Sequence, residues 1–377
     1  MSDSGVVVAR AVRSTVTEGA KVSIRVDEVE ISPPGANEVI IKVGASPINP
    51  SDLGMLLAGG VVSTAKAETG PACTVLDLSE GAMAAAGARL GQPMPVGNEG
   101  AGVVVEAGDS AEAQALMGRT VAVLAGGMYA THRKVAASQC LVLAEGVEPV
   151  DAASCFVNPL TALGMTETMR LEGHIALVHT AAASNLGQML NRVCLADGID
   201  LVSIVRRSEH VELLKGQGAT HVVDSSLDSF GSDLTAALVD TGATIAFDAV
   251  GGGGLASQVL ASMEAAANAS GGEFNRYGSS VHKQVYVYGG LDRSPTVLDR
   301  TYGMAWSVGG WLLLPFLDRV GPKRAGELRQ RVADELGSTF ASRYEAVISL
   351  DDIVDPAVMA GYAKMATGRK VLVSPNG

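Results

Sequence analysis

Cysteine is scarce in this 377-residue chain, and its four copies lie far apart, at Cys73, Cys140, Cys155 and Cys194. No C-x-x-C pair occurs. The spacing therefore excludes a knuckle-type zinc site and provides no disulfide framework. We expect reduced thiols in a cytoplasmic protein, because disulfides persist mainly in oxidising compartments.

Excess basic charge is also lacking, because 28 lysines and arginines stand against 40 acidic residues. The formal net charge of −12 argues against a nucleic-acid partner, which usually needs a basic face, and against an anionic membrane surface. The longest apolar run, 308–317, is too short to cross a bilayer. The first residues lack the basic start and the long apolar stretch of a signal peptide.

Hydrophobic residues make up 47% of the chain, and its length favours two domains with separate cores. The first half contains short apolar runs separated by glycine and proline, which predict a compact, mostly antiparallel β domain. The strand-like runs are 22–26, 38–43, 102–105, 120–124 and 139–143.

From residue 152 the pattern changes to strand, glycine turn and helix, repeated along the chain. Strand-like runs at 175–178, 201–205, 221–223, 244–247 and 284–288 alternate with helical stretches. This alternation predicts an α/β fold with a doubly wound parallel sheet. The tail adds a helix at 322–336, a strand at 345–349, a helix at 356–366 and a strand at 370–373. The segments 56–92 and 271–283 look like insertions.

The first strand of the predicted parallel sheet ends in a turn of small residues. Compared with G-x-G-x-x-G, this turn has Ala182, Ser184 and Gly187 at the glycine positions. Small residues let a pyrophosphate approach the backbone N–H groups at a helix N-terminus. An ordinary strand–helix turn is the alternative. The candidate cofactor-binding residues of the turn are Ala182, Ser184, Asn185, Leu186 and Gly187.

The second strand ends in basic residues, where an NAD site would carry Asp or Glu for the ribose 2′-hydroxyl. Arg206 and Arg207 stand there, and His210 follows one helical turn later. Two guanidinium groups suit a 2′-phosphate, so we expect NADPH as the cofactor. Two solvated arginines at a strand end are the alternative.

Several motifs occur in an order that resembles the medium-chain dehydrogenase/reductase superfamily, and within it the zinc-independent, NADPH:quinone oxidoreductase-like proteins. They are P-I-N-P-S-D-L at 47–53, V-G-N-E-G-A-G-V-V at 96–104, N-P-L-T-A at 158–162, the turn at 182–187, G-A-T-H-V-V-D at 218–224, F-D-A-V-G-G at 247–252, V-Y-G-G at 287–290 and G-R-K-V-L-V at 368–373. The resemblance implies a GroES-like domain (1–152 and 318–377), a Rossmann domain (153–317) and an active-site cleft between them.

The resemblance also bears on metal binding. The positions that hold the catalytic zinc in alcohol dehydrogenases of the superfamily correspond to Asn49, Asn98 and Val157, none of which suits zinc. The four-cysteine structural zinc lobe is missing as well. We therefore expect no metal.

Hydride transfer to a quinone or an α,β-unsaturated carbonyl needs mainly placement of the acceptor and one or two donors near its oxygen. Asn49 and Tyr129 are the catalytic candidates, although a turn role for Asn49 and a packing role for Tyr129 are alternatives. Thr161 resembles the residue that lies close to the nicotinamide in the family, and its hydroxyl would serve equally well as a helix cap. The remaining cofactor candidates are Val250, Gly251, Tyr288 and Gly289.

Two other functions stay open. The same motifs are similar to 2-enoyl thioester reductases, but the tyrosine that follows N-P-S-D in that group is absent after Asp52. An NADPH-binding protein without efficient catalysis is the second alternative. The acceptor pocket is expected along the segments 56–92 and 271–283. The strand at 286–288 resembles the sheet edge through which relatives form homodimers, although burial inside the sheet would explain it too.

Overall fold

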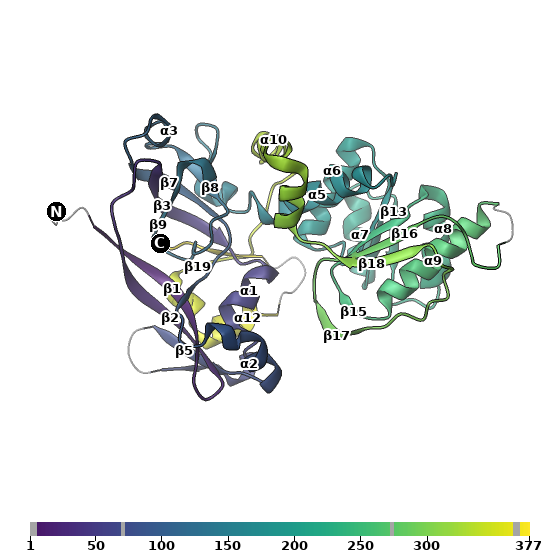
Figure 1. Ribbon diagram of the computed structural model, residues 1–377, viewed down its shortest axis with the longest axis horizontal. Coiled ribbons are helices and arrows are strands. Elements are labelled where there is room, and N and C mark those ends of the chain that lie inside the picture. The colour runs from purple at the N-terminus through teal and green to yellow at the C-terminus, as the bar shows by residue number, and fades with distance from the viewer. Residues whose placement is uncertain (1–5, 69–71, 272–274, 365–369) are drawn as a thin grey trace. The chain divides into compact units, whose positions relative to one another are not determined.

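The computed structural model describes residues 6–68, 72–271, 275–364 and 370–377, and it divides into two compact units (Figure 1). Unit 1 contains residues 1–157 and 329–377, and unit 2 contains residues 158–328. The boundaries that we expected, after residues 152 and 317, lie before those of the two units, which fall after residues 157 and 328. The assignment of a substrate domain and a cofactor domain stays a prediction.

Two β-sheets build unit 1. The first has the order β4-β5-β2-β1-β6 and is antiparallel throughout. Its strands are β1 (Val7–Thr17), β2 (Lys21–Ile31), β4 (Lys66–Ala67), β5 (Cys73–Asp77) and β6 (Met94–Pro95). Because β5 pairs with β2 and Leu76 is fully buried, the central part of the expected insertion 56–92 belongs to the sheet and its core.

The second sheet of unit 1 joins segments that are distant in sequence. Its order is β10-β8-β7-β3-β20-β19, and β9 also pairs with β3. The strands are β3 (Glu38–Pro47), β7 (Gly100–Ala107), β8 (Thr120–Val123), β9 (His132–Ala136), β10 (Leu141–Val142), β19 (Ala346–Ile348) and β20 (Val371–Val373). The tail therefore completes a sheet that begins near the N-terminus.

Short helices accompany these sheets. They are α1 (Pro50–Leu57), α2 (Glu80–Ala86), α3 (Ala111–Gln114), α4 (Pro149–Ala152), α11 (Leu350–Ile353) and α12 (Pro356–Tyr362). One core packs α1 and α12 against the first sheet through Leu56, Ile24, Leu76 and Met359, all of which are fully buried. Apolar burial of this kind is the main stabilising contribution to such a unit.

Unit 2 contains a six-stranded parallel sheet with the order β13-β12-β11-β14-β16-β18. In chain order this is 3-2-1-4-5-6, the order of dinucleotide-binding sheets. The strands are β11 (Leu177–His179), β12 (Leu201–Val205), β13 (His221–Asp224), β14 (Ile245–Asp248), β16 (Lys283–Val287) and β18 (Trp306–Gly310). The predicted α/β fold class, with a parallel sheet and a mostly β second domain, is confirmed.

Helices precede, separate and follow the strands of unit 2. They are α5 (Val157–Leu171), α6 (Asn185–Asp197), α7 (Ser208–Gly216), α8 (Phe230–Thr241), α9 (Leu255–Ala269) and α10 (Leu313–Asp334). A small pair, β15 (Gly251–Gly253) and β17 (Asp292–Thr296), lies beside the main sheet. Helix α10 is broken at Gly321, whose φ of 79° is not helical, and Pro322 starts the second part where a helix at 322–336 was expected.

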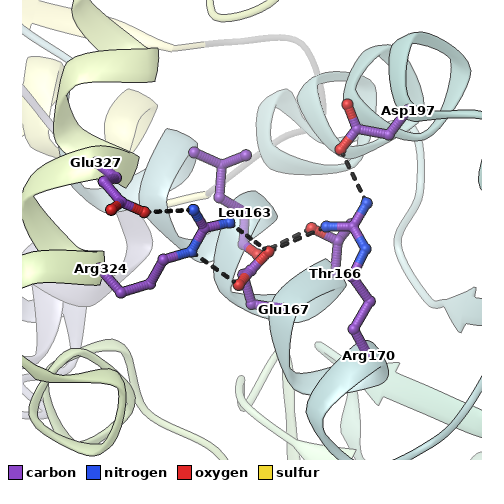
Figure 2. Close-up of polar contacts among 7 residues, drawn as sticks. All are labelled: Leu163, Thr166, Glu167, Arg170, Asp197, Arg324 and Glu327. Carbon is purple, nitrogen blue, oxygen red and sulfur yellow. Dashed lines mark hydrogen bonds and ion pairs between the residues drawn. The ribbon is translucent and has the colours of Figure 1, made fainter.

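Charged side chains connect α5 with α10 and α6 through hydrogen bonds and ion pairs (Figure 2). Glu167 on α5 accepts two hydrogen bonds from Arg324 on α10, at 2.9 and 3.1 Å, and one from Arg170 at 3.0 Å. Arg170 also donates to Asp197 at the end of α6. This network holds together the helices α5, α6 and α10.

Several strands lie where no strand was expected, namely β1, β4, β5, β6, β9, β15, β17 and β18. Strand β1 precedes the first strand-like run expected from the sequence, at 22–26, and β18 lies just before and within the apolar run at 308–317. Strand β16 lies between β14 and β18, so the segment 286–288 belongs to the interior of the sheet and not to its edge. Tyr286 lies in this interior strand and Tyr288 directly follows it, and both are half-buried. None of the helices described here is both long and apolar enough to cross a membrane.

Candidate functional site

The turn after β11 in unit 2 has the tight form that the sequence suggests. Ser184 caps α6, and its hydroxyl accepts a hydrogen bond from the Gly187 N–H at 3.1 Å. A Cβ atom at Gly187 would lie 2.2 Å from the carbonyl oxygen of Ala182, so only glycine fits there. Ala181 turns the chain with a φ of 51°, and Ala182 is fully buried.

Backbone N–H groups at the start of α6 make this turn suitable for a phosphate. The first N–H groups of a helix have no partner within the helix, and its N-terminus attracts negative charge. Asn185 and Leu186 open the helix, and the buried Nδ2 atom of Asn185 has no hydrogen-bond partner among the described residues. Because Gly187 has no side chain, the backbone of the turn at Ala182 lies close against the start of α6. A tight turn at a helix N-terminus fits a pyrophosphate.

The basic residues lie at the end of β12, next to this turn. The Ala182 N–H donates to the Ile204 carbonyl at 3.1 Å, which ties the turn to β12. Arg206 and Arg207 are exposed and precede α7. Arg207 donates to Glu209 at 3.2 Å, and the same carboxylate lies 3.8 Å from His210. Glu209 was not among the residues expected in the site.

Buried polar groups join β11 and β14 at the point where the strand order reverses. Thr180 donates to Asp248 at 2.8 Å and accepts from the Ala249 N–H at 2.8 Å. The Asp248 carboxylate also accepts from the N–H groups of Val250 and Gly251, at 2.9 and 3.1 Å. Asp248 thus fixes the backbone of two cofactor candidates, in the crevice where such sheets bind ligands.

His179 and Tyr288 form a further pair at this end of the sheet. The Nε2 atom of His179 shares a hydrogen bond of 2.7 Å with the Tyr288 hydroxyl, and the two rings stack. Burial lowers the pKa of His179 to about 3, so its imidazole is neutral at ordinary pH. The main chain of Tyr288 is bonded to Asp248, and Gly289 follows it. Thr161, also in unit 2, is buried in α5.

Asn49 in unit 1 is held by a carboxylate. Its side chain is almost fully buried, and its Nδ2 atom donates to Glu99 Oε1 at 2.7 Å. Glu99 Oε2 accepts from the N–H groups of Phe156 and Val157, at 2.8 and 2.9 Å. The Asn49 Oδ1 atom is buried without a partner among the described residues. A carboxyl oxygen that accepts from the Asn49 Nδ2 group fixes which end of the amide faces Glu99.

Two more buried ionisable groups belong to unit 1. Asp52 accepts from the N–H groups of Asn49 and Asn98, at 2.8 and 2.7 Å. Burial raises the pKa of Asp52 to about 7, against the effect of these two bonds. Burial also lowers the pKa of Lys370 to about 8, although Glu99 and Asp52 oppose that shift. Lys370 donates to Ser154 at 2.7 Å. The sequence motif at 368–373 contains Lys370 but does not predict its burial.

Tyr129 lies inside unit 1 with no exposed surface, and its hydroxyl donates to the Pro47 carbonyl at 3.1 Å. It would therefore reach an acceptor only by rearranging, and its catalytic role stays a prediction. The amides of Asn49 and Asn98 are bonded to Glu99 and Ser51. In the described part of the chain, no three His, Cys, Asp or Glu side chains are placed to hold a metal ion.

No family model matches the chain. A mitochondrial enoyl-[acyl-carrier-protein] reductase of Xenopus tropicalis is 29% identical over 208 residues, 53% of this chain and 51% of that protein. The chain thus spans about half the length of this curated relative.

The similarity to solved structures covers the whole chain. A putative NADPH:quinone reductase of Mesorhizobium loti is 25% identical, with all of both chains covered and a TM-score of 0.72. An enoyl thioester reductase of Candida tropicalis, 18% identical over 98% of this chain and 100% of that one, shares the fold with a TM-score of 0.66. Similar structures at 19% identity include complexes with NADP and NADPH. The resemblance to the medium-chain dehydrogenase/reductase superfamily and its NADPH:quinone oxidoreductase-like members is confirmed.

Proposed function

We propose that this chain is an NADPH-dependent oxidoreductase that reduces a quinone or an α,β-unsaturated carbonyl without a metal ion. The observation that carries the proposal is the Gly187 turn beside two arginines, on a sheet with the dinucleotide-binding order. NADPH is also the cofactor in the names of structural neighbours. When bound, NADPH supplies a hydride.

In this proposal the residues of unit 2 hold and orient the cofactor. The N–H groups at the start of α6 bind the pyrophosphate, which the close approach at Gly187 admits. Arg206 and Arg207 bind the ribose 2′-phosphate, because guanidinium groups pair with phosphate through two hydrogen bonds. The Asp248 bonds to Val250 and Gly251 fix the loop on the nicotinamide side.

The residues of unit 1 place the acceptor. Glu99 orients the Asn49 amide, and two backbone N–H groups fix Glu99 in turn. Supporting groups of this kind keep a polar side chain in one geometry while the acceptor changes charge. The positions that hold zinc in some relatives carry two amides and an aliphatic side chain, which suit no zinc ion.

Reduction of a 2-enoyl thioester is the second candidate, because the curated relative and one structural neighbour carry that activity in their names. The helix that follows Asn49, α1, contains no tyrosine. This favours a quinone, because hydride transfer to it gives an aromatic hydroquinone oxyanion, whereas the thioester gives an enolate whose carbon must still receive a proton. A homodimer and a cytoplasmic location stay predictions.

The first experiment follows NADPH absorbance with an ortho-quinone and, in parallel, with a short enoyl thioester. Turnover of the quinone alone supports the proposal, and turnover of the thioester favours the second candidate. If NADPH binds tightly but neither acceptor consumes it, the chain is a cofactor-binding protein without catalysis.

The cofactor assignment has a separate test. Replacing Arg206 and Arg207 by serine should weaken NADPH binding far more than NADH binding. Equal losses for the two cofactors would contradict the 2′-phosphate assignment.

A further inference from the structure

Glu209 lies among the basic residues at the end of β12. Its Oε1 atom accepts a hydrogen bond from Arg207 at 3.2 Å and lies 3.8 Å from Nε2 of His210. The side chains of Arg207 and Glu209 are 62% and 67% exposed, so burial does not hold this ion pair together. Exposed ion pairs are weak and are readily exchanged for another partner.

The two arginines differ in what they contact. Arg207 is the residue before α7 and is bonded to Glu209 in the first turn of that helix. Arg206 is exposed, and it forms no ion pair with a described residue. A carboxylate near a helix N-terminus is in a favourable position, which is also where a phosphate would be favoured. Glu209 thus occupies a place where a phosphate group would be attracted.

We propose that the Glu209 carboxylate competes with the 2′-phosphate of the cofactor for Arg207. Arg207 stays bonded to Glu209 until the phosphate displaces the carboxylate. The inference rests on the proposed function. Arg206 is then the first guanidinium group to contact the phosphate, and Arg207 joins it only by leaving Glu209. The carboxylate also repels the phosphate directly, because both carry negative charge. Glu209 therefore lowers the affinity for NADPH without contributing to NADH binding.

The test measures binding of 2′,5′-ADP and of 5′-AMP by calorimetry, because these probes differ only in the 2′-phosphate and need no turnover. Glu209→Gln should tighten 2′,5′-ADP binding about two- to fivefold, the size expected for one exposed charge, and should leave 5′-AMP binding unchanged. Glu212→Gln is the matched control, since it removes the same charge one turn further along α7. It should change 2′,5′-ADP binding much less.

The two arginines complete the design. Arg206→Ala should weaken 2′,5′-ADP binding more than Arg207→Ala in the native chain. In the Glu209→Gln background the loss caused by Arg207→Ala should grow, because Arg207 is then free to bind the phosphate. Such coupling between neighbouring residues is what a double-mutant cycle measures.

The outcomes separate the inference from the proposed function. If Glu209→Gln leaves 2′,5′-ADP binding unchanged or weaker while the arginine variants lose it, Glu209 is not a competitor and the 2′-phosphate assignment stands. An equal gain in Glu212→Gln would mean a general charge effect and would also overturn the inference. If the arginine variants bind 2′,5′-ADP as the native chain does, the proposed cofactor site itself fails.

Discussion

Glu264 and Lys283 form a buried ion pair in unit 2, and removing one charge should destabilise the unit strongly. The Lys283 side chain has no exposed surface, that of Glu264 is 8% exposed, and Nζ lies 2.6 Å from Oε2. The Lys283 ammonium also donates to the Ser279 hydroxyl at 3.1 Å and to the Val281 carbonyl at 2.8 Å. Glu264→Gln keeps the shape but leaves a buried ammonium unpaired, which typically costs about 3–5 kcal/mol.

Both tryptophans of the chain lie in unit 2, so tryptophan fluorescence reports the unfolding of that unit. Trp306 and Trp311 belong to that unit, and Trp306 lies opposite Lys283 in the pairing of β16 with β18. Urea unfolding followed by tryptophan fluorescence therefore reports the unit that contains the ion pair. The double variant Glu264→Gln/Lys283→Met should recover most of the loss, because it leaves no unpaired charge.

The control is an exposed ion pair in the same unit. Arg324 and Glu327 approach to 2.7 Å with side chains 43% and 47% exposed, so Glu327→Gln should cost about 1 kcal/mol or less. Hydrogen bonds from Lys283 and Ser279 outweigh burial and lower the pKa of Glu264. The stabilisation that Glu264 provides should therefore be lost as the pH falls through that lowered pKa. Equal losses in Glu264→Gln and Glu327→Gln at neutral pH would refute the reasoning.

Two further predictions concern the turn of unit 2 and the polar core of unit 1. Gly187→Ala should cost about 1–3 kcal/mol and weaken NADPH binding, because its Cβ would lie 2.2 Å from the Ala182 oxygen. Gly216→Ala meets no atom within 4 Å and is its control in thermal melts and NADPH titrations. Burial raises the pKa of Asp52 to about 7, so the folded chain keeps the carboxyl proton at pH values where the unfolded chain has lost it. The free energy of unfolding should therefore fall by up to roughly 4 kcal/mol as the pH rises from about 4 to 7. Thermal melts of Asp52→Asn should lack this fall, and an identical pH profile would contradict the assignment.

The parallel sheet was predictable because its strands are short apolar runs that alternate with helices. The runs at 201–205 and 284–288 lie within a residue of β12 and β16. The turn was predictable because only small residues fit around Gly187. Strand β18 was not, since glycines occupy two of its five positions, whereas β1 alternates between buried and more exposed residues in its second half, a pattern that does indicate a strand.

The buried charges were the least predictable part of the site. Lys370 directly precedes an apolar strand, and from sequence alone a lysine there resembles an exposed strand end. In the fold it is buried and donates to Ser154, which is distant in the chain. Glu209 was not predictable as a site residue, because an acidic residue in the first turn of a helix is common and stabilises the helix. Such contacts arise from tertiary packing, which a local pattern does not contain.

The pairing of β3 with β20 has a consequence for how the chain is made. On the ribosome, β3 is synthesised early, but the neighbour that completes its sheet, near Leu372, emerges only after the whole of unit 2. Unit 2 is continuous in sequence and has its own core, so it can fold while synthesis continues. Unit 1 must wait, with the edge of β3 at Ser46 and Pro47 unpaired until β20 is made. We therefore expect nascent chains that stop before β20 to be the species most dependent on chaperones.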